Sequence, residues 1–386
     1  MKKIKLGDAC EILNGFAFKS ENYVGSGIRV IRISNVQKGY IEDNTPAFYP
    51  LETKGLEKYM LEEGDLLISL TGNVGRVAIL EKEFMPAALN QRVACLRLKT
   101  DKLSKRYLFH ILNSDFFEKQ CIQYSKGVAQ KNMSTAWLKD YEILLYSKEQ
   151  QELIADILDK MHLIKKLRYY ELQKLDELVK ARFVEMFGDP IENQKDWEVV
   201  KIRDIVTDVR YGTSKPAVEG GRYPYLRMNN LTVDGGLDLS DLKYIDIPDN
   251  EIEKCVVRKG DILFNRTNSI DLIGKTAVFN LLDDMVIAGY IIRIRLNDQI
   301  LPDVFSQYMN LETMKKILRG MAKGAVNQAN INAQELQSIK VYIPDMELQR
   351  QYVEFKEEID KSRSRIQKSL EASQELFDSL MQEYFG

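Results

Sequence analysis

Histidine is scarce in this chain of 386 residues, which contains only two, and cysteine is nearly as rare at four. Two histidines leave little material for a His-based metal site or for acid–base catalysis by imidazole. The cysteines lie far apart and have no CxxC spacing, which predicts reduced thiols rather than a disulfide framework or a zinc site. With only 9 prolines, long proline-rich linkers are not expected.

Long apolar runs are also missing. No stretch approaches the roughly 18 apolar residues that span a bilayer, so we expect no membrane segment. Residues 1–8 are charged and lack the apolar core of a secretory signal, which predicts a cytoplasmic protein. Lys and Arg number 55 and Asp and Glu 57, for a net charge of −2, so the chain is not a uniformly basic nucleic-acid binder. An anionic partner would have to be held by local patches.

Catalytic signatures are absent from the sequence as well. There is no GxxxxGK[ST] phosphate loop, no GxGxxG after a strand, no HExxH and no GxSxG elbow. His110 and His162 lie in apolar helical stretches, which favours packed side chains over general bases. We therefore expect a recognition or scaffold protein, and an enzyme of unrecognised type is the least favoured alternative.

What the chain does have is a long internal repeat. Four blocks return in the same order at an offset between about 195 and 200 residues. The matched blocks are 32–36 with 227–231, 63–68 with 259–264, 125–128 with 322–325, and 186–188 with 384–386. Because 386 residues exceed what one core usually holds, the repeat predicts two similar domains.

Each repeat has the pattern of an α+β, mixed α/β domain followed by a long helix. Short β-branched runs predict strands at 28–33, 65–70 and 93–98, and apolar spacing predicts one helix over about 105–125, repeated near 304–318. A capping box begins a long helix at Ser147, and Asp345 is a good N-cap for the second. The predicted boundaries are 1–146 and 189–343 for the domains, and 147–188 and 344–386 for the helices.

The two long helices each carry an apolar stripe that must be buried. We predict that they pack on each other as an antiparallel coiled coil with internal pseudo-two-fold symmetry. The alternative is that each helix packs on its own domain or on a partner.

This layout resembles the DNA specificity subunit of type I restriction-modification systems. The blocks that carry the resemblance are 5–8 with 201–204, 64–68 and 75–76 with 260–263 and 274–275, and 149–154 with 348–353. The chain departs from the family at Leu145 and Tyr146, where a proline pair is common, and the second repeat keeps only Pro344.

The resemblance implies a function for each part. Each globular domain would be a target-recognition domain that reads one half of a bipartite, asymmetric sequence in double-stranded DNA. The helices would set the spacing and dock two methyltransferase (modification) subunits, which motor/restriction subunits join. S-adenosylmethionine, ATP and Mg would act in those partners. This chain would then not be an enzyme by itself and would need no cofactor or metal. A non-catalytic coiled-coil adaptor whose domains bind proteins remains the alternative.

Base edges are read by Arg, Asn, Gln and Ser or Thr side chains, and phosphates by basic ones, so polar loops are the candidate DNA-binding sites. The candidates in the first repeat are Arg32, Ser34, Asn35, Thr71, Asn73, Arg76, Asn90, Gln91, Arg92, Lys126, Gln130, Lys131 and Asn132. Those in the second are Tyr211, Lys215, Arg227, Asn229, Asn230, Asn265, Arg266, Thr267, Asn268, Lys275, Tyr290, Lys323, Asn327, Gln328 and Asn330.

A structural role competes with the DNA role at these positions. Asn35, Asn73 and Asn268 can simply shape turns, because Asn tolerates left-handed backbone conformations. The Gly-Asp pairs at 64–65 and 260–261 are typical of turns that precede a buried strand. The loops at 69–73 and 265–269 differ in chemistry, which predicts half-sites that also differ.

Overall fold

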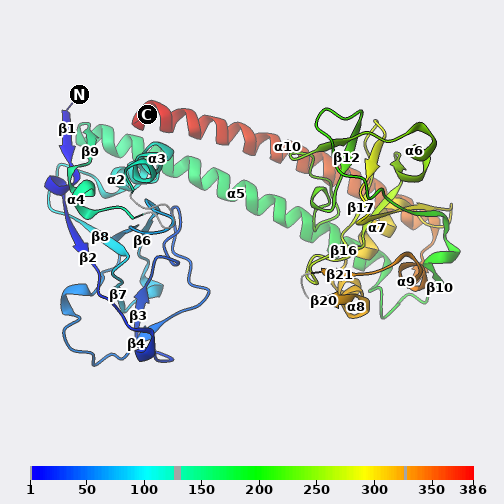
Figure 1. The fold of residues 1–386 in the computed structure, drawn as a ribbon, viewed down its shortest axis with the longest axis horizontal. Coiled ribbons are helices and arrows are strands. Elements are labelled where there is room, and N and C mark those ends of the chain that lie inside the picture. Colours follow the sequence, from blue (N-terminus) through cyan, green and yellow to red (C-terminus); the bar gives the residue numbers. More distant parts are fainter. Residues whose placement is uncertain (1, 126–131, 326–327) are drawn as a thin grey trace. The chain divides into compact units, whose positions relative to one another are not determined.

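The computed structural model describes residues 2–125, 132–325 and 328–386, and the chain divides into two compact units (Figure 1). Unit 1 comprises Met1–Arg168 and Ser369–Gly386, and unit 2 comprises Tyr169–Lys368. Each unit holds one domain of strands and short helices together with part of each long helix. The predicted mixed α/β class is confirmed.

Unit 1 is built from small sheets. A four-stranded antiparallel sheet has the order β2-β8-β5-β6, a three-stranded sheet has the order β4-β3-β7, and β1 pairs with β9. The strands are β1 (Lys2–Lys5), β2 (Cys10–Asn14), β3 (Ile28–Ile31), β4 (Phe48–Tyr49), β5 (Leu66–Ser69), β6 (Val77–Ile79), β7 (Ala87–Leu89), β8 (Val93–Leu98) and β9 (Glu142–Leu145). The helices of this domain are α1 (Leu6–Ala9), α2 (Lys105–Leu112), α3 (Asp115–Tyr124) and α4 (Thr135–Asp140).

Unit 2 repeats this plan. Its main sheet has the equivalent order β11-β19-β15-β17, a second sheet has the order β13-β12-β18-β14, and β10 pairs with β22. These strands are β10 (Glu198–Lys201), β11 (Val206–Tyr211), β12 (Tyr223–Leu226), β13 (Lys243–Ile245), β14 (Val256–Val257), β15 (Ile262–Asn265), β17 (Thr276–Val278), β18 (Met285–Ile287), β19 (Ile291–Leu296) and β22 (Lys340–Ile343). The helices are α6 (Asp249–Cys255), α7 (Pro302–Asn310), α8 (Glu312–Met321) and α9 (Ala333–Ser338).

The single helix predicted over about 105–125 is wrong. The chain forms α2 and α3 instead, and Ser114 begins the second by accepting a hydrogen bond from the Phe117 amide. In unit 2, Leu311 also separates α7 from α8, but through its extended backbone and without a side-chain cap. The apolar spacing continues through both breaks, so periodicity alone does not reveal the N-cap that ends one helix and starts the next.

The Gly-Asp turns have the predicted structural role. The Asp65 carboxylate accepts hydrogen bonds from the Glu62 amide and from Arg97 at 2.7 and 2.9 Å. Asp261 does the same with the Arg258 amide and Arg295. Each aspartate is about one-twentieth exposed, so it joins the turn to the neighbouring strand by a half-buried ion pair.

Two long helices complete the fold, α5 (Lys148–Phe187) and α10 (Met346–Phe385). The predicted capping box at the start of α5 is confirmed by reciprocal hydrogen bonds between Ser147 and Gln150. Asp345 caps α10 by accepting from the Glu347 amide at 2.9 Å. No helix among the described residues is long and apolar enough to cross a membrane.

Within each unit the start of one long helix packs beside the end of the other. In unit 1, Ile154 and Leu158 of α5 share the core with Phe385 of α10. In unit 2, the rings of Phe183 and Phe187 from α5 lie 5.3 and 5.5 Å from that of Tyr352 in α10. The predicted antiparallel pairing of α5 and α10 is therefore present in both units (Figure 1).

The helix ends are exchanged between the sequence repeats. Phe187 closes the first repeat but belongs to the core of unit 2, and Phe385 closes the second repeat but belongs to the core of unit 1. A structural unit is consequently built from both sequence repeats.

A buried glutamine fastens each long helix to its domain. The side chain of Gln151 accepts from the Ser104 amide at 2.7 Å and donates to the carbonyls of Lys102 and Tyr146, both at 2.9 Å. Gln349 makes the equivalent bonds with Leu301 and two carbonyls. Both side chains are completely buried, so these bonds satisfy backbone groups that water cannot reach.

Both histidines of the chain lie together in unit 1. His110 on α2 is 1% exposed and its Nε2 lies 2.7 Å from Asp159 Oδ1 on α5. The rings of His110 and His162 stack with centroids 6.0 Å apart. Burial lowers the pKa of both imidazoles below the ordinary value of 6.5, and for His110 this outweighs the opposing pull of Asp159.

These histidines predict that unit 1 is the acid-sensitive unit. Because both pKa values are lowered on folding, the stabilisation is complete above about pH 6.5 and is lost as the pH falls below it. Each histidine can contribute a slope of up to about 1.4 kcal/mol per pH unit. We expect the melting temperature of unit 1 to fall more than that of unit 2 between about pH 7 and about pH 5.

The chain contains one tryptophan in each unit as a fluorescence reporter, and unit 2 shows which residue can replace His110. Trp137 and Trp197 are its only tryptophans, and they lie in unit 1 and unit 2 respectively. Gln307 in α7 has the position equivalent to His110. His110 lies six residues after Ser104, which bonds Gln151, and Gln307 lies six residues after Leu301, which bonds Gln349. His110→Gln should therefore reduce the acid sensitivity reported by Trp137 fluorescence. Equal pH dependence of the two units in the unaltered chain would contradict this account.

Candidate nucleic-acid interface

A small sheet in unit 2 brings distant candidate residues together. It has the order β16-β21-β20, from β16 (Thr267–Asn268), β21 (Gln328–Asn330) and β20 (Lys323–Ala325). Thr267 Oγ1 donates a hydrogen bond of 3.0 Å to Asn330 Oδ1, which fixes the strands in register. The side chains of Lys323 and Gln328 are exposed. More than fifty residues of sequence separate the two edges of this sheet.

Arg266 and two tyrosines lie beside this sheet. The Arg266 guanidinium lies 4.9 Å from the centroid of the Tyr211 ring, and the Arg266 amide donates to the Tyr290 carbonyl at 2.9 Å. The Tyr211 hydroxyl is held in place by the Ala333 amide, which donates to it at 2.8 Å. Tyr211 and Tyr290 are 43% and 49% exposed. We call Tyr211, Arg266, Asn268, Tyr290 and Gln328 the unit 2 polar surface.

The same place in unit 1 carries different side chains. The backbones of Thr71 and Asn132 pair in an antiparallel β-bridge, as those of Thr267 and Asn330 do in unit 2. The Leu70 amide donates a hydrogen bond to the Arg92 carbonyl at 2.9 Å. Asn73, Gln91 and Arg92 are exposed beside this bridge. We call Asn73, Gln91, Arg92 and Asn132 the unit 1 polar surface. The candidates Lys126, Gln130, Lys131 and Asn327 lie outside the described residues.

Several other candidates are buried and use their polar atoms within the fold. Asn35 accepts from the Arg32 amide and donates to the Glu42 carbonyl, and Asn230 makes the equivalent bonds in unit 2. The Lys275 ammonium donates to the backbone carbonyls of Met228 and Leu231. The candidates that are less than one-tenth exposed are Asn35, Thr71, Asn90, Asn230, Asn265, Thr267 and Lys275. Their contact with DNA stays a prediction, and the structure supplies a structural role for them.

The charged candidates outside the polar surfaces already have partners. Arg227 pairs with Asp241 at 2.7 Å, and Lys215 pairs with Glu251 at 2.8 Å. Arg32 donates to the Thr45 carbonyl and Arg76 to Gln37. Ser34 and Asn229 are exposed at equivalent turns. These residues stay weaker predictions than those of the two polar surfaces.

The sequence reading missed one contributor, Glu335. This carboxylate binds the Lys323 ammonium at 2.5 Å and also accepts from the Asn332 amide at the start of α9. Asn332 and Glu335 form a capping box, whose spacing is visible in the sequence and could have identified the residue. The charge of Lys323 on the small sheet is therefore already neutralised by Glu335.

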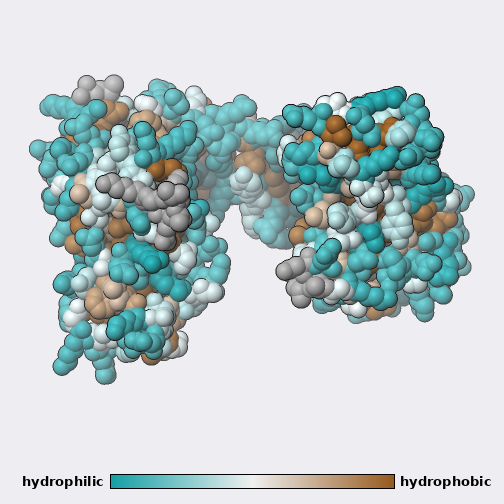
Figure 2. Space-filling model, viewed as in Figure 1, coloured by the Kyte–Doolittle hydropathy of each residue, from teal (hydrophilic) through white to brown (hydrophobic). Residues whose placement is uncertain are grey.

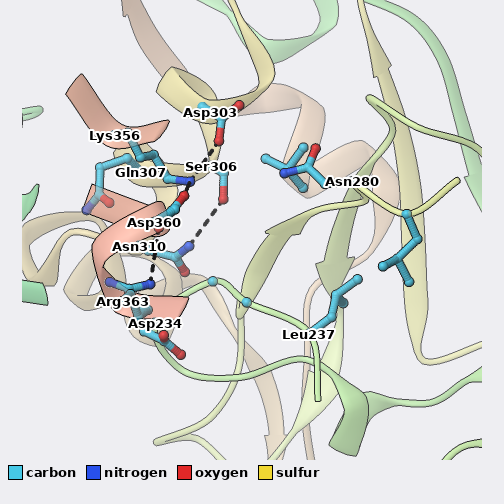
Figure 3. Close-up of a pocket in the computed structure, with 14 residues that line it drawn as sticks. Asp234, Leu237, Asn280, Asp303, Ser306, Gln307, Asn310, Lys356, Asp360 and Arg363 are labelled. Carbon is cyan, nitrogen blue, oxygen red and sulfur yellow. Dashed lines mark hydrogen bonds and ion pairs between the residues drawn. The ribbon is translucent and has the colours of Figure 1, made fainter. Parts of the chain in front are cut away.

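A polar cavity of about 240 Å³ lies elsewhere in unit 2, between α7, α10 and the turn at Asp234 (Figure 3). Lys356 bridges Asp303 and Asp360 at 2.9 Å each across its wall. The Gln307 amide lines the cavity, and its nitrogen has no hydrogen-bond partner among the described residues. Lys356 and Arg363 of α10 are both engaged with aspartates, so the cavity lies at a joint between α10 and the domain of unit 2.

Metal chemistry is not indicated by the described part of the chain. Among those residues, no three His, Cys, Asp or Glu side chains are grouped so that they could hold a metal ion. Burial also raises the pKa of the Cys10 and Cys121 thiols to about 12, so both stay protonated and unreactive.

Hydrophilic side chains cover most of the visible face of each unit (Figure 2).

The fold repeats one mixed α/β domain twice, and each copy packs on the start of one long helix and the end of the other. The family model described as type I restriction modification DNA specificity domain matches residues 1–176 and again 194–374. The chain therefore belongs to this family and carries two copies of its domain.

Curated relatives agree with this membership. The putative type I restriction enzyme MjaX specificity subunit of Methanocaldococcus jannaschii is 30% identical over 198 residues, which are 50% of this chain and 46% of that protein. The chain thus spans about half the length of this relative. The type I restriction enzyme EcoKI specificity subunit of Escherichia coli is 21% identical over 383 residues, which are 93% of this chain and 82% of that protein.

Solved structures share the fold. The S subunit of a type I restriction-modification system from M. genitalium aligns with a TM-score of 0.59 at 15% identity, covering 100% of this chain and 96% of that one. A chain from a structure on complex assembly and conformational transition of the type I R-M system aligns with a TM-score of 0.61 at 16% identity, covering 100% and 97%. At these identities the similarity concerns the fold alone.

Proposed function

We propose that this chain is the DNA-recognition subunit of a type I restriction-modification complex, and that each domain reads one half of a bipartite target. The observation that carries the proposal is the presence of two copies of the DNA specificity domain, each with an equivalent polar surface. The long helices would set the distance between the half-sites. No observation favours the adaptor alternative.

The target is expected to be asymmetric. The unit 1 polar surface offers Arg92 where the unit 2 polar surface offers Tyr290, and Leu70 in unit 1 stands where unit 2 has Arg266. Hydrogen-bonding groups that differ read different base edges, because each base pair shows a distinct pattern in the major groove. Two half-sites of different sequence follow from two surfaces of different chemistry.

The chain would act without catalytic groups of its own. Its relatives are named specificity subunits, which supports a division of labour with other subunits. In that arrangement two modification subunits methylate adenine with S-adenosylmethionine, and motor/restriction subunits use ATP and Mg. Exposed apolar side chains on α5 offer a docking face for the modification subunits: Leu153, Leu163 and Leu167 are 60%, 55% and 50% exposed.

Mapping methylated adenines tests the proposal. The chain is produced together with its modification subunits in a host that lacks adenine methylation, and the genome is sequenced for N6-methyladenine. We expect one bipartite, non-palindromic motif that disappears when this chain is omitted. A palindromic motif, or methylation that does not depend on this chain, would contradict the proposal.

A further inference from the structure

We infer that each domain reads a guanine through a single arginine, and that this arginine comes from a different strand end in each unit: Arg92 in unit 1 and Arg266 in unit 2. This inference rests on the proposed function and makes it more specific. It assigns one G·C base pair to each half-site and names the side chain that recognises it.

The backbone shows that the two places are equivalent. In unit 1 the Leu70 amide donates to the Arg92 carbonyl, and the Met133 amide donates to the Leu70 carbonyl at 2.8 Å. In unit 2 the Arg266 amide donates to the Tyr290 carbonyl, and the Ile331 amide donates to the Arg266 carbonyl at 2.9 Å. Leu70 therefore corresponds to Arg266, and Arg92 corresponds to Tyr290.

The two units carry their arginine at different positions of this pair. Unit 1 has an apolar Leu70 at the first position and Arg92 at the second, whereas unit 2 has Arg266 at the first and Tyr290 at the second. The two positions are neighbours because a backbone hydrogen bond joins them, although the Leu70 side chain is buried in the core of unit 1 and Arg92 is exposed. Each unit thus has one arginine at this pair of positions, attached at a different point of the backbone.

The surroundings leave both guanidinium groups available. Arg92 is exposed and has no ion pair among the described residues. Arg266 stacks on Tyr211 and makes one long hydrogen bond of 3.4 Å to the Gly289 carbonyl, and its Nε has no partner in the part of the chain that the structure describes. Neither guanidinium is neutralised by a carboxylate there, in contrast to Arg227 with Asp241.

An unneutralised guanidinium has the chemistry that guanine requires. Arginine donates two parallel hydrogen bonds to O6 and N7 of guanine, which is the commonest base-specific contact in the major groove. Tyr211 fixes the plane of the Arg266 fork, so less conformational freedom is lost on binding. A phosphate contact would use the charge alone and would not depend on the base.

The test compares single substitutions in the assembled complex with modification subunits, using a randomised duplex library and methylated-adenine mapping. For Arg266→Ala we expect one guanine position, in one half-site only, to become degenerate, with discrimination reduced by about 10- to 100-fold. For Arg92→Ala we expect the same at one guanine of the other half-site. Arg266→Lys keeps a cation on Tyr211 but lacks the fork, and it should lose the same base preference.

Controls separate the possible outcomes. Arg222→Ala removes an exposed arginine that pairs with Asp249 and lies outside the unit 2 polar surface, so it should leave both half-sites intact. Uniform weakening on all sequences would mean a phosphate contact and would overturn the inference, as would relaxation of a base other than guanine. An unaltered complex without a bipartite motif would instead defeat the proposed function itself.

Discussion

Replacing Phe187 with alanine is expected to destabilise unit 2 by about 3–5 kcal/mol. Phe187 is fully buried, and its ring packs edge-on against Phe183 at 4.9 Å and Tyr352 at 5.5 Å. Its removal leaves a cavity where the end of α5 meets the start of α10. Unit 1 should change by no more than about 0.5 kcal/mol, because Phe187 contributes nothing to its core.

The reciprocal substitution tests the exchange of helix ends directly. Phe385→Ala should destabilise unit 1, where the Phe385 ring lies 5.7 Å from that of Tyr107, and spare unit 2. Denaturant titrations followed by fluorescence resolve the two units in Trp137→Phe and Trp197→Phe backgrounds. If each alanine instead destabilised the unit of its own sequence repeat, the exchanged arrangement would be wrong.

Gln349→Leu is expected to destabilise unit 2 by about 3 kcal/mol or more. Leucine has a similar volume but cannot replace the bond to the Leu301 amide or the bonds to the carbonyls of Gln299 and Pro344. Each of these buried groups would be left without a partner, at a cost of about 1–3 kcal/mol. Because the bonds join the start of α10 to the domain, the helix should also fray from that end.

A matched control isolates the effect of burial. Gln351 lies on the same turn of α10 but is exposed, so Gln351→Leu should change the stability by less than about 0.5 kcal/mol. Gln151→Leu should repeat the large effect in unit 1, as reported by Trp137. Hydrogen exchange at the first turns of α10 checks the fraying. A tolerated Gln349→Leu would show that these bonds contribute little.

Local signals in the sequence predicted the local structure well. The capping box at Ser147 and the N-cap at Asp345 begin helices where they were expected, because a cap requires only residues within one turn. The Gly-Asp turns were interpreted correctly for the same reason. The break between α2 and α3 was missed because Ser114 caps a helix inside an uninterrupted apolar pattern.

The candidate DNA-binding residues show that the sequence alone does not predict which polar side chains are exposed. Asn73 and Asn35 have the same chemistry and similar turn contexts, yet one is exposed and the other is buried with its amide bonded to backbone groups. Burial depends on which distant segments fold over a side chain, and no nearby residue reports that.

The amino-acid sequence by itself determined the duplication, the mixed α/β class, the helix starts and the family, since repeats, periodicity and caps are properties of neighbouring residues. Only the tertiary structure decided that α5 ends in the core of unit 2 and α10 in the core of unit 1, and that Arg92 and Arg266 lie at opposite ends of equivalent backbone hydrogen bonds. Both facts depend on contacts between segments far apart in the chain, whose free energy comes from burial and not from local preference.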